Sequence, residues 1–217
     1  MDRRAFVSTA GLAAATSVIA SPAIAQSQPT IRWRLQSSFP KSLDAIYGAG
    51  EAFAKAVAEL TDGRFQIQVF AAGEIIPPLQ VLDGVSINTV EVCHTSSFFF
   101  VGKNEAFTFG TAVPYGLNTR QQNAWMYQGG GIELMNTLYR KSNVYGLPCG
   151  NTGAQMGGWF RKEINSPNDR KGLKFRIAGL AGQVMLKLGV VPQQIAGGAI
   201  YPALETGDDR RRRMDRP

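Results

Sequence analysis

An arginine near the end of a short alternating stretch is one candidate for ligand chemistry in this sequence. Arg176 lies on the polar face of a predicted strand, just before the Gly179-x-x-Gly182 turn into a predicted helix. A guanidinium can hold a carboxylate bidentately, and the free amides of a helix N-terminus can assist it. Surface arginines are also common. The residue types therefore leave two roles open, a ligand contact and a solvated strand-edge arginine.

The segment GNTGAQMGGWF, residues 150–160, is the second candidate. Its glycines allow the backbone to approach a ligand closely, while Asn151, Thr152 and Gln155 offer neutral hydrogen-bonding groups. A glycine-rich connection between two lobes would have the same composition. The segment is therefore predicted to be either part of a binding site or a crossover.

Catalytic patterns are missing from the sequence. No Ser-His-Asp, Cys-His or metal-cluster spacing occurs, and the single histidine, His94, excludes most histidine-dependent metal and acid-base arrangements. The run SSFFFVGK places Phe98, Phe99 and Phe100 after a predicted strand, where they form hydrophobic core or a cleft wall. Residue types thus favour binding over catalysis.

The basic charge of the chain is concentrated at its end. The formal net charge is +7 at a pI near 9.6, and the last residues contain a run of four arginines. Between these arginines and the N-terminal segment the chain is mildly basic and has no basic stripe. We therefore predict no nucleic-acid partner.

Residues 1–25 are predicted to be an export signal. They have a basic start, a short apolar stretch and a small-x-small cleavage site that ends at Ala25. The pair Arg3-Arg4 resembles a twin-arginine signal, and an ordinary secretory signal is the alternative. The mature chain would begin at Gln26 in the periplasm.

Two cysteines would meet oxidising conditions there. Cys93 and Cys149 each follow an apolar, strand-like run, so a disulfide between strand tips is conceivable. Free, buried thiols are the favoured interpretation.

Two α/β units are predicted to position these candidates. Alternating apolar residues indicate strands over 30–39, 64–70 and 88–97, with a helix over 43–60 and a shorter one over 79–85. A β-α-β-α-β order requires a parallel sheet with helices on its faces.

A second series of strands and helices is predicted after a helical stretch that glycines interrupt. Two α/β units that join near residue 150 favour a ligand cleft between lobes, because loops at strand ends gather there. The later predicted elements are a helical stretch at 125–138 that is broken at 129–131, strands over 143–153, 173–178 and 190–198, and helices over 179–188 and from 200.

Several runs together resemble one family, the solute-binding subunits of tripartite ATP-independent periplasmic (TRAP) transporters, in the branch that binds 2-oxo acids. The resemblance is continuous as far as Glu205 and is carried by RWRLQSSFPKSLD, DGRFQIQVFAAGEIIPPLQVLDGV, GNTGAQMGGWFRKEIN, LKFRIAGLAGQVMLKLGVVPQQIAGG and IYPALE. It implies a two-lobed α/β periplasmic binding protein that closes on its ligand without covalent chemistry, and TRAP membrane subunits as partners.

The same resemblance implies roles for individual residues. It places the carboxylate-binding arginine at Arg176, and it places a glutamine that contacts both substrate and a bound sodium ion at Gln155. Asn151 and Phe100 are further candidates for substrate contacts. Where relatives have tyrosines this chain has phenylalanines, so the ligand is expected to be more apolar or held differently. The alternatives are a binding protein for another organic acid or amide, and an exported enzyme.

The end of the chain departs from this family. Back-translated with GC-rich codons and with one base removed after Gly207, GDDRRRRMDRP becomes Gly-Thr-Ile-Asp-Ala-Ala-Glu-Trp-Ile-Gly-Pro, which is the family's continuation. The sequence thus predicts a frameshift, with lobes at 26–150 and 151–206 and a frameshifted tail at 207–217. The second lobe would be incomplete and the other sodium ligands lost. Intact relatives dimerise, whereas this chain is not expected to.

Overall fold

A computed structural model of the chain describes residues 29–205. The predicted export signal at 1–25, with its twin-arginine pair, lies outside these residues. The predicted frameshifted tail at 207–217 also lies outside them.

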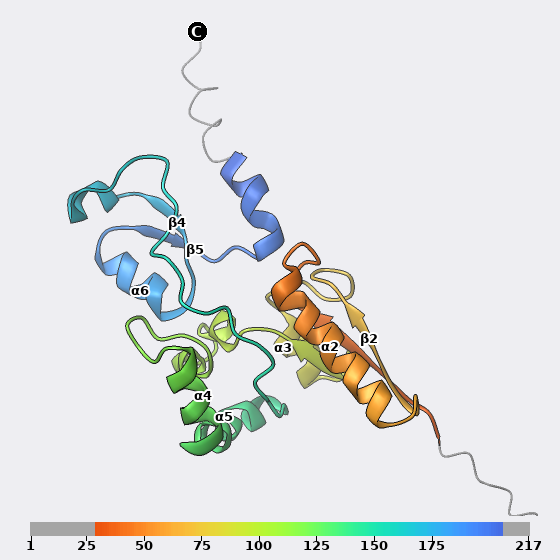
Figure 1. Cartoon of the computed structure of the whole chain (residues 1–217). Helices are drawn as coiled ribbons and strands as arrows, with labels where there is room; N and C mark the ends of the chain where they lie inside the picture. The colour runs from red at the N-terminus through yellow and green to blue at the C-terminus, as the bar shows by residue number, and fades with distance from the viewer. Residues whose placement is uncertain (1–28, 206–217) are drawn as a thin grey trace, which may run out of the picture.

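A parallel three-stranded sheet forms the first unit, in the strand order β2-β1-β3. Its strands are β1 (Ile31–Ser37), β2 (Phe65–Phe70) and β3 (Val92–His94). The helices α2 (Asp44–Leu60) and α3 (Val81–Ser86) make the crossovers between strands, and α2 runs along the sheet in Figure 1. The predicted β-α-β-α-β order is therefore confirmed.

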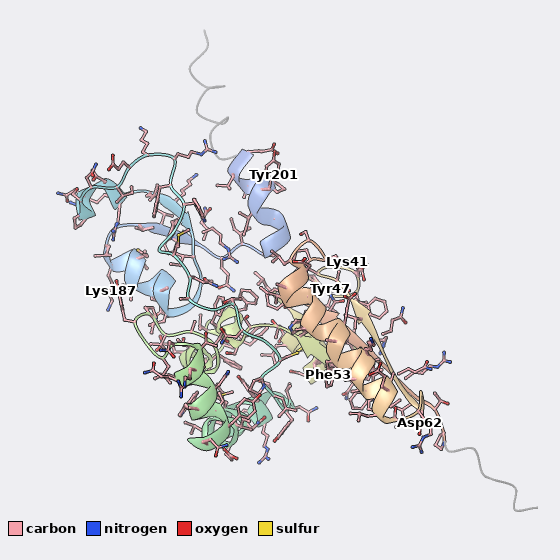
Figure 2. The ribbon with its side chains drawn as sticks, viewed as in Figure 1. Lys41, Tyr47, Phe53, Asp62, Lys187 and Tyr201 are labelled. Carbon is pink, nitrogen blue, oxygen red and sulfur yellow. The ribbon has the colours of Figure 1, made fainter. Side chains whose placement is uncertain are left out.

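One face of this sheet packs under α2. Leu35 of β1 is only 2% exposed, and a Cβ at Gly50 of α2 would come within 3.3 Å of the His94 ring and 3.6 Å of the Leu35 side chain. Glycine at this position lets the helix cross closely over the sheet. Figure 2 marks the helix from Lys41, just before its start, to Asp62, just after its end. Lys41 also pairs with Glu74 at 3.3 Å, which ties the start of α2 to the loop after β2.

A compact hydrophobic core lies beside α3, where the chain leaves β3. Two 3₁₀ helices, η1 (Ser97–Phe100) and η2 (Glu105–Gly110), follow β3 and supply its aromatic side chains. Burying each large side chain here contributes about 1.5–3 kcal/mol. The members of the core are Ile76, Val81, Leu82, Val85, Val90, Phe100 and Phe107.

The predicted glycine interruption separates two helices, α4 (Thr119–Gln128) and α5 (Gly131–Tyr139). Asn118 and Gln121 form a reciprocal capping box at the start of α4, with both hydrogen bonds at 3.0 Å. Gly130 has φ 78°, a left-handed conformation that glycine adopts readily, so the chain turns between the helices here.

A second, two-stranded parallel sheet pairs β4 (Lys174–Arg176) with β5 (Val191–Gln193). Helix α6 (Gly179–Lys187) makes the crossover, and residues 200–205 are helical (Figure 1). The remaining short helices are η3 (Arg140–Ser142), η4 (Pro167–Arg170) and η5 (Gly197–Ala199).

Three strand predictions were too long or wrong. The strand expected over 143–153 is absent; this segment is irregular, and its apolar Tyr145 and Leu147 are exposed because no strand edge lies beside it. The strand expected over 88–97 shrinks to β3, since Asn88 has φ 59° and η1 begins at Ser97. β5 likewise covers only part of 190–198.

Both cysteines are free thiols, as favoured from the sequence. Cys93 is partly buried in β3, and burial raises the pKa of its thiol to about 12. Cys149 is exposed rather than buried, because it lies in the irregular segment.

An ion pair joins β1 to the residue that precedes β3. Glu91 accepts hydrogen bonds from the Arg34 backbone N (2.7 Å), Nε (3.2 Å) and Nη2 (2.7 Å). These bonds hold the pKa of Glu91 at about 2, below its usual value of 4.5. The carboxylate form is therefore stabilised in the folded chain.

We expect Glu91→Gln to lower the melting temperature at pH 7 by about 2–4 °C. A carboxyl group with a depressed pKa contributes stability that is fully present above pH 4.5 and is lost as the pH falls toward 2. The difference in melting temperature between the parent and Glu91→Gln should therefore become smaller between pH 5 and pH 3. Thermal unfolding at pH 7, 5, 4 and 3 measures it, and a difference that does not change with pH would contradict the role of this pair.

Candidate functional site

The carboxyl ends of the first sheet's strands meet at Ser37 of β1 and His94 of β3. The Ser37 Oγ and His94 Nδ1 atoms are 3.4 Å apart, and the Phe39 ring packs edge-on against the histidine at 5.2 Å. Burial lowers the pKa of His94, so its ring is neutral at pH 7. The histidine is a packed, hydrogen-bonded residue, as is usual for a lone histidine on a strand.

Arg176 ends β4, at the carboxyl edge of the second sheet, just before α6. Its Nε donates a hydrogen bond to the Ile195 carbonyl at 3.0 Å, which fixes the plane of the guanidinium. Within residues 29–205 no other hydrogen bond or ion pair occupies this side chain. Partial burial lowers its pKa, but an arginine remains protonated at neutral pH. The remaining N–H groups can therefore donate to an anion.

The second sheet's unit touches the end of the first sheet at η1. The Gln194 Nε2 donates to the Phe99 carbonyl at 2.8 Å, although the two residues are 95 positions apart in sequence. Gly179, with φ 65°, lies against Phe98: a Cβ there would be 3.3 Å from the phenylalanine ring. Phe98 and Phe99 pack with ring centroids 4.6 Å apart. These contacts bring the start of α6, close to Arg176, beside the phenylalanine run.

Sequence reasoning did not identify Gln194. It appeared only as part of the strand-like run VVPQQIAGG, where a glutamine has no distinctive pattern. Its partner is a backbone carbonyl, so no residue type elsewhere in the sequence points to the contact.

Gln155 and Asn151 lie in the irregular segment and are exposed. Gln155 Nε2 donates to Thr152 Oγ1 at 3.0 Å. Asn151 Oδ1 accepts from Thr119 Oγ1 at 3.0 Å and from the Gly153 backbone at 2.7 Å. Within the part of the chain that the structure describes, no hydrogen bond joins either residue to Arg176.

Phe100 has a different position from its two neighbours. It is only 3% exposed and packs at 6.0 Å from Phe107 within the hydrophobic core. This placement leaves its ring no surface for a ligand and favours a structural role. Phe98 and Phe99, which are half-buried, are the members of the run that face the second unit.

No metal-binding cluster accompanies these residues. Among residues 29–205, no group of three or more His, Cys, Asp or Glu side chains could hold an ion. One amide oxygen, as in Gln155, falls short of the several oxygens that a hard cation requires. The same residues contain no helix that is long and apolar enough to cross a bilayer.

A surface hollow of about 240 Å³ lies elsewhere, on the first halves of β1 and β2. Its lining includes none of the ligand candidates, and Arg34 in its wall already binds Glu91. The hollow is therefore not the predicted site. It is lined by Arg32, Trp33, Arg34, Gln66 and Gln68.

Comparison with known families shows which family the chain belongs to. The family described as bacterial extracellular solute-binding protein, family 7 (DctP), matches residues 36–208. The chain belongs to the DctP family. The predicted resemblance to solute-binding subunits of TRAP transporters is thereby confirmed.

Among curated proteins, this DctP chain is similar to a monocarboxylate 2-oxoacid-binding periplasmic protein of Nostoc sp. (strain PCC 7120). The two are 52% identical over 213 residues, a match that covers 95% of this chain and 58% of the relative. The chain thus spans little more than half the length of the curated relative it matches.

Solved structures of TRAP transporter solute-binding proteins share its fold. A TRAP transporter solute-binding protein from Bordetella bronchiseptica, described as a mixed-occupancy dimer with copurified calcium and picolinate, is 54% identical with a TM-score of 0.81; the match covers 82% of this chain and 53% of that one. A protein from Pseudoalteromonas atlantica with bound sodium and pyruvate is 42% identical with a TM-score of 0.79, over 82% and 54% of the two chains. These matches confirm the predicted α/β periplasmic binding protein fold.

Proposed function

We propose that this DctP chain captures a 2-oxo monocarboxylate such as pyruvate in the periplasm and delivers it to the membrane subunits of a TRAP transporter. The observation that carries the proposal is Arg176, a guanidinium held in one plane by the Ile195 carbonyl with its remaining donors unoccupied. Binding and release, without covalent chemistry, suffice for this function. We infer that the protein is not an enzyme.

The arrangement around Arg176 suits a small carboxylate. A fixed, planar guanidinium forms two parallel charge-assisted hydrogen bonds to a carboxylate. Phe98 and Phe99, beside the start of α6, provide an apolar wall for the rest of the ligand. The site thus combines one strong anchor with a hydrophobic surface, as small-molecule sites commonly do.

A cation is expected to accompany the acid. The relatives are described with pyruvate and sodium, pyruvate and calcium, or picolinate and calcium. Pyruvate and picolinate both carry an electron-pair donor on the carbon next to the carboxylate, so each can chelate a cation in a five-membered ring. We propose that Gln155 contributes one oxygen to this ion and to the acid, with Asn151 as a further polar contact, after the lobes close.

The lobes of this proposal are residues 26–150 and 151–206. Their separate sheets, with the contact between Gln194 and Phe99, support a hinged capture in which the cleft closes over the ligand. The lobe boundaries remain a prediction. The monomeric state of this chain is also a prediction, although the Bordetella relative is described as a dimer.

Calorimetry tests the proposed function. We expect pyruvate and longer 2-oxo acids to bind with a Kd below about 100 µM, more tightly when sodium or calcium is present. Pyruvamide, which keeps the oxo group but lacks the negative charge, is the matched ligand control and should not bind. A folded chain, by circular dichroism, that binds none of these acids would exclude the proposal. Chemical conversion of the acid would instead indicate an exported enzyme.

A further inference from the structure

A buried amide on α5 holds the backbone of the irregular segment that follows this helix. Asn136 is only 2% exposed. Its Oδ1 accepts a hydrogen bond from the Gly146 backbone N–H at 2.7 Å, and its Nδ2 donates to the Gly146 carbonyl at 3.0 Å. The same Nδ2 also donates to the Ile132 carbonyl of α5 at 2.9 Å. Both N–H groups of the amide and one lone pair of its oxygen are therefore occupied.

The two bonds to Gly146 resemble those that a neighbouring strand would make. In an antiparallel sheet, two residues of a hydrogen-bonded pair exchange one N–H and one carbonyl, as the Asn136 amide does with Gly146. Residues 143–153 pair with neither sheet, so their backbone has no such neighbour. A flipped amide would set Nδ2 against the Gly146 N–H, so the bond pair permits only one orientation of the side chain.

The hydrophobic core supports this attachment. A Cβ at Gly146 would lie 2.6 Å from the Tyr139 ring, so only glycine lets the backbone approach α5 this closely. Tyr139 in turn stacks on Phe107 of the core, with ring centroids 5.8 Å apart. The Val144 backbone N–H donates to the Tyr139 carbonyl at 3.3 Å. The start of the segment is therefore fixed by buried aromatic packing as well as by Asn136.

The attached segment leads to a proposed ligand contact. Asn151 follows Gly146 by five residues, and its Oδ1 accepts from Thr119 Oγ1 at 3.0 Å, at the start of α4. Between them, a Cβ at Gly150 would lie 3.6 Å from the Cβ of Ala49 on α2. Residues 143–151 thus lie along the helices of the first unit.

The chain is more open after this attached segment, residues 143–151. A Cβ at Gly153, which has φ 69°, would have no atom within 4 Å, and Gln155 is exposed. The chain then packs on the second sheet, where the Phe160 ring stacks on Phe175 of β4 at 5.1 Å. Figure 1 shows this run from the end of α5 to β4. The position of the segment is therefore determined mainly by its attachments to the first unit.

We propose that Asn136 is a positioning residue for the ligand site, because it holds residues 143–151 on α5 and thereby sets where the Asn151 amide lies. This inference rests on the proposed function, in which Asn151 contacts the acid. The Asn151 oxygen is turned toward Thr119 and the Gly153 N–H, which leaves its Nδ2 out of both bonds. A displacement of about 1 Å would weaken a hydrogen bond from this amide to a bound acid.

Cys149 provides a reporter within the segment. Its thiol is exposed, whereas Cys93 is partly buried and has its pKa raised to about 12, so a maleimide nitroxide at pH 7 should label Cys149 selectively. Cys149→Ser is the control and should take up no label. Electron paramagnetic resonance then measures the mobility of the segment without any ligand.

Asn136→Leu should release the segment, because leucine has a similar size but makes no hydrogen bond to Gly146. We expect the rotational correlation time of the label to fall at least about threefold. In the unlabelled variant, the Kd for pyruvate by calorimetry should rise at least about tenfold. Circular dichroism checks that the variant is folded.

Asn136→Asp separates positioning from packing. A protonated carboxyl group has one donor and one acceptor and can make both bonds to Gly146, whereas a carboxylate cannot donate to the Gly146 carbonyl. Burial keeps a carboxyl group protonated to a higher pH than usual. The label should therefore be mobile at pH 8 and match the parent at pH 5, and the Kd for pyruvate should follow. The parent at both pH values accounts for all other titrating groups.

Asn123→Asp is the matched control. Asn123 is an exposed asparagine on the neighbouring helix α4. This variant should keep the label mobility of the parent, and its Kd for pyruvate should stay within about twofold at both pH values. If Asn136→Leu does not fold, Asn136→Asp still provides the comparison between pH 8 and pH 5.

Two results would overturn the inference. A label that keeps the parent's mobility in the Asn136 variants at pH 8 would show that the amide does not hold the segment. A mobile label with a Kd for pyruvate within about twofold of the parent would show that the attachment does not position the ligand site. A parent chain that binds no 2-oxo acid overturns the proposed function instead, and the label mobility still decides whether Asn136 holds the segment.

Discussion

Replacing Arg176 with methionine is expected to weaken pyruvate binding at least about 100-fold, because two charge-assisted hydrogen bonds are lost together. Methionine keeps much of the side chain's length and apolar stem. Arg176→Lys should retain the charge but lose the planar fork and the bond to Ile195, for a loss of about tenfold. Titration calorimetry of parent and variants at pH 7 measures both effects.

Lys174→Met is the matched control for this prediction. Lys174 lies two residues earlier on the same face of β4 and is exposed, so it shares the strand and the charge of Arg176. Its replacement should leave the Kd within about twofold. Equal losses in the two methionine variants would show that general positive charge, and not the Arg176 guanidinium, attracts the acid. Unchanged binding by Arg176→Met would remove the arginine from the site.

Phe100→Ala is expected to destabilise the fold by about 3–5 kcal/mol, the usual cost of a large cavity in a core. The side chain is 3% exposed and packs with Phe107, so the loss comes from buried contacts. The melting temperature should fall by about 10 °C or more. Chemical denaturation at 10 °C gives the free energy of unfolding directly.

Ligand affinity separates the two roles considered for Phe100. In the milder variant Phe100→Leu, which should remain folded, we expect the pyruvate Kd to change less than about twofold. Phe98→Ala is the comparison, since its half-buried ring lies against Gly179 at the start of α6. Phe98→Ala should reduce the free energy of pyruvate binding more than it reduces the free energy of unfolding. A large loss of affinity in Phe100→Leu at unchanged stability would return Phe100 to the binding site.

Most of the fold could be predicted from periodicity. Strand β1 has apolar residues at every second position, and α2 has them at helical spacing, so the local pattern predicted both elements. It did not predict which side chains they bury: Gln36 of β1 is fully buried, whereas Phe53 of α2 is 43% exposed. The break between α4 and α5 followed from three consecutive glycines, one of which is left-handed at Gly130. In each of these elements a short stretch of sequence contains its own signal.

The segment 143–153 shows where this reasoning fails. Its apolar residues favour a strand, but a strand requires a neighbour, and the sheets end elsewhere. The candidate site divides in the same way. The position of Arg176 at a strand end, just before a helix, was predictable because both elements have local patterns. The positions of Gln155 and Asn151 were not, because they lie in an irregular segment with no local pattern.

The bond from Gln194 to Phe99 bears on how this site can evolve. Its acceptor is a main-chain carbonyl, which every amino acid at position 99 would supply. The ring at that position can therefore change as the ligand changes, while the link between the two units is kept. Of the two side chains, only that of Gln194 is required for this hydrogen bond. Single substitutions at position 99 could thus change the proposed ligand wall and leave the junction behind it intact.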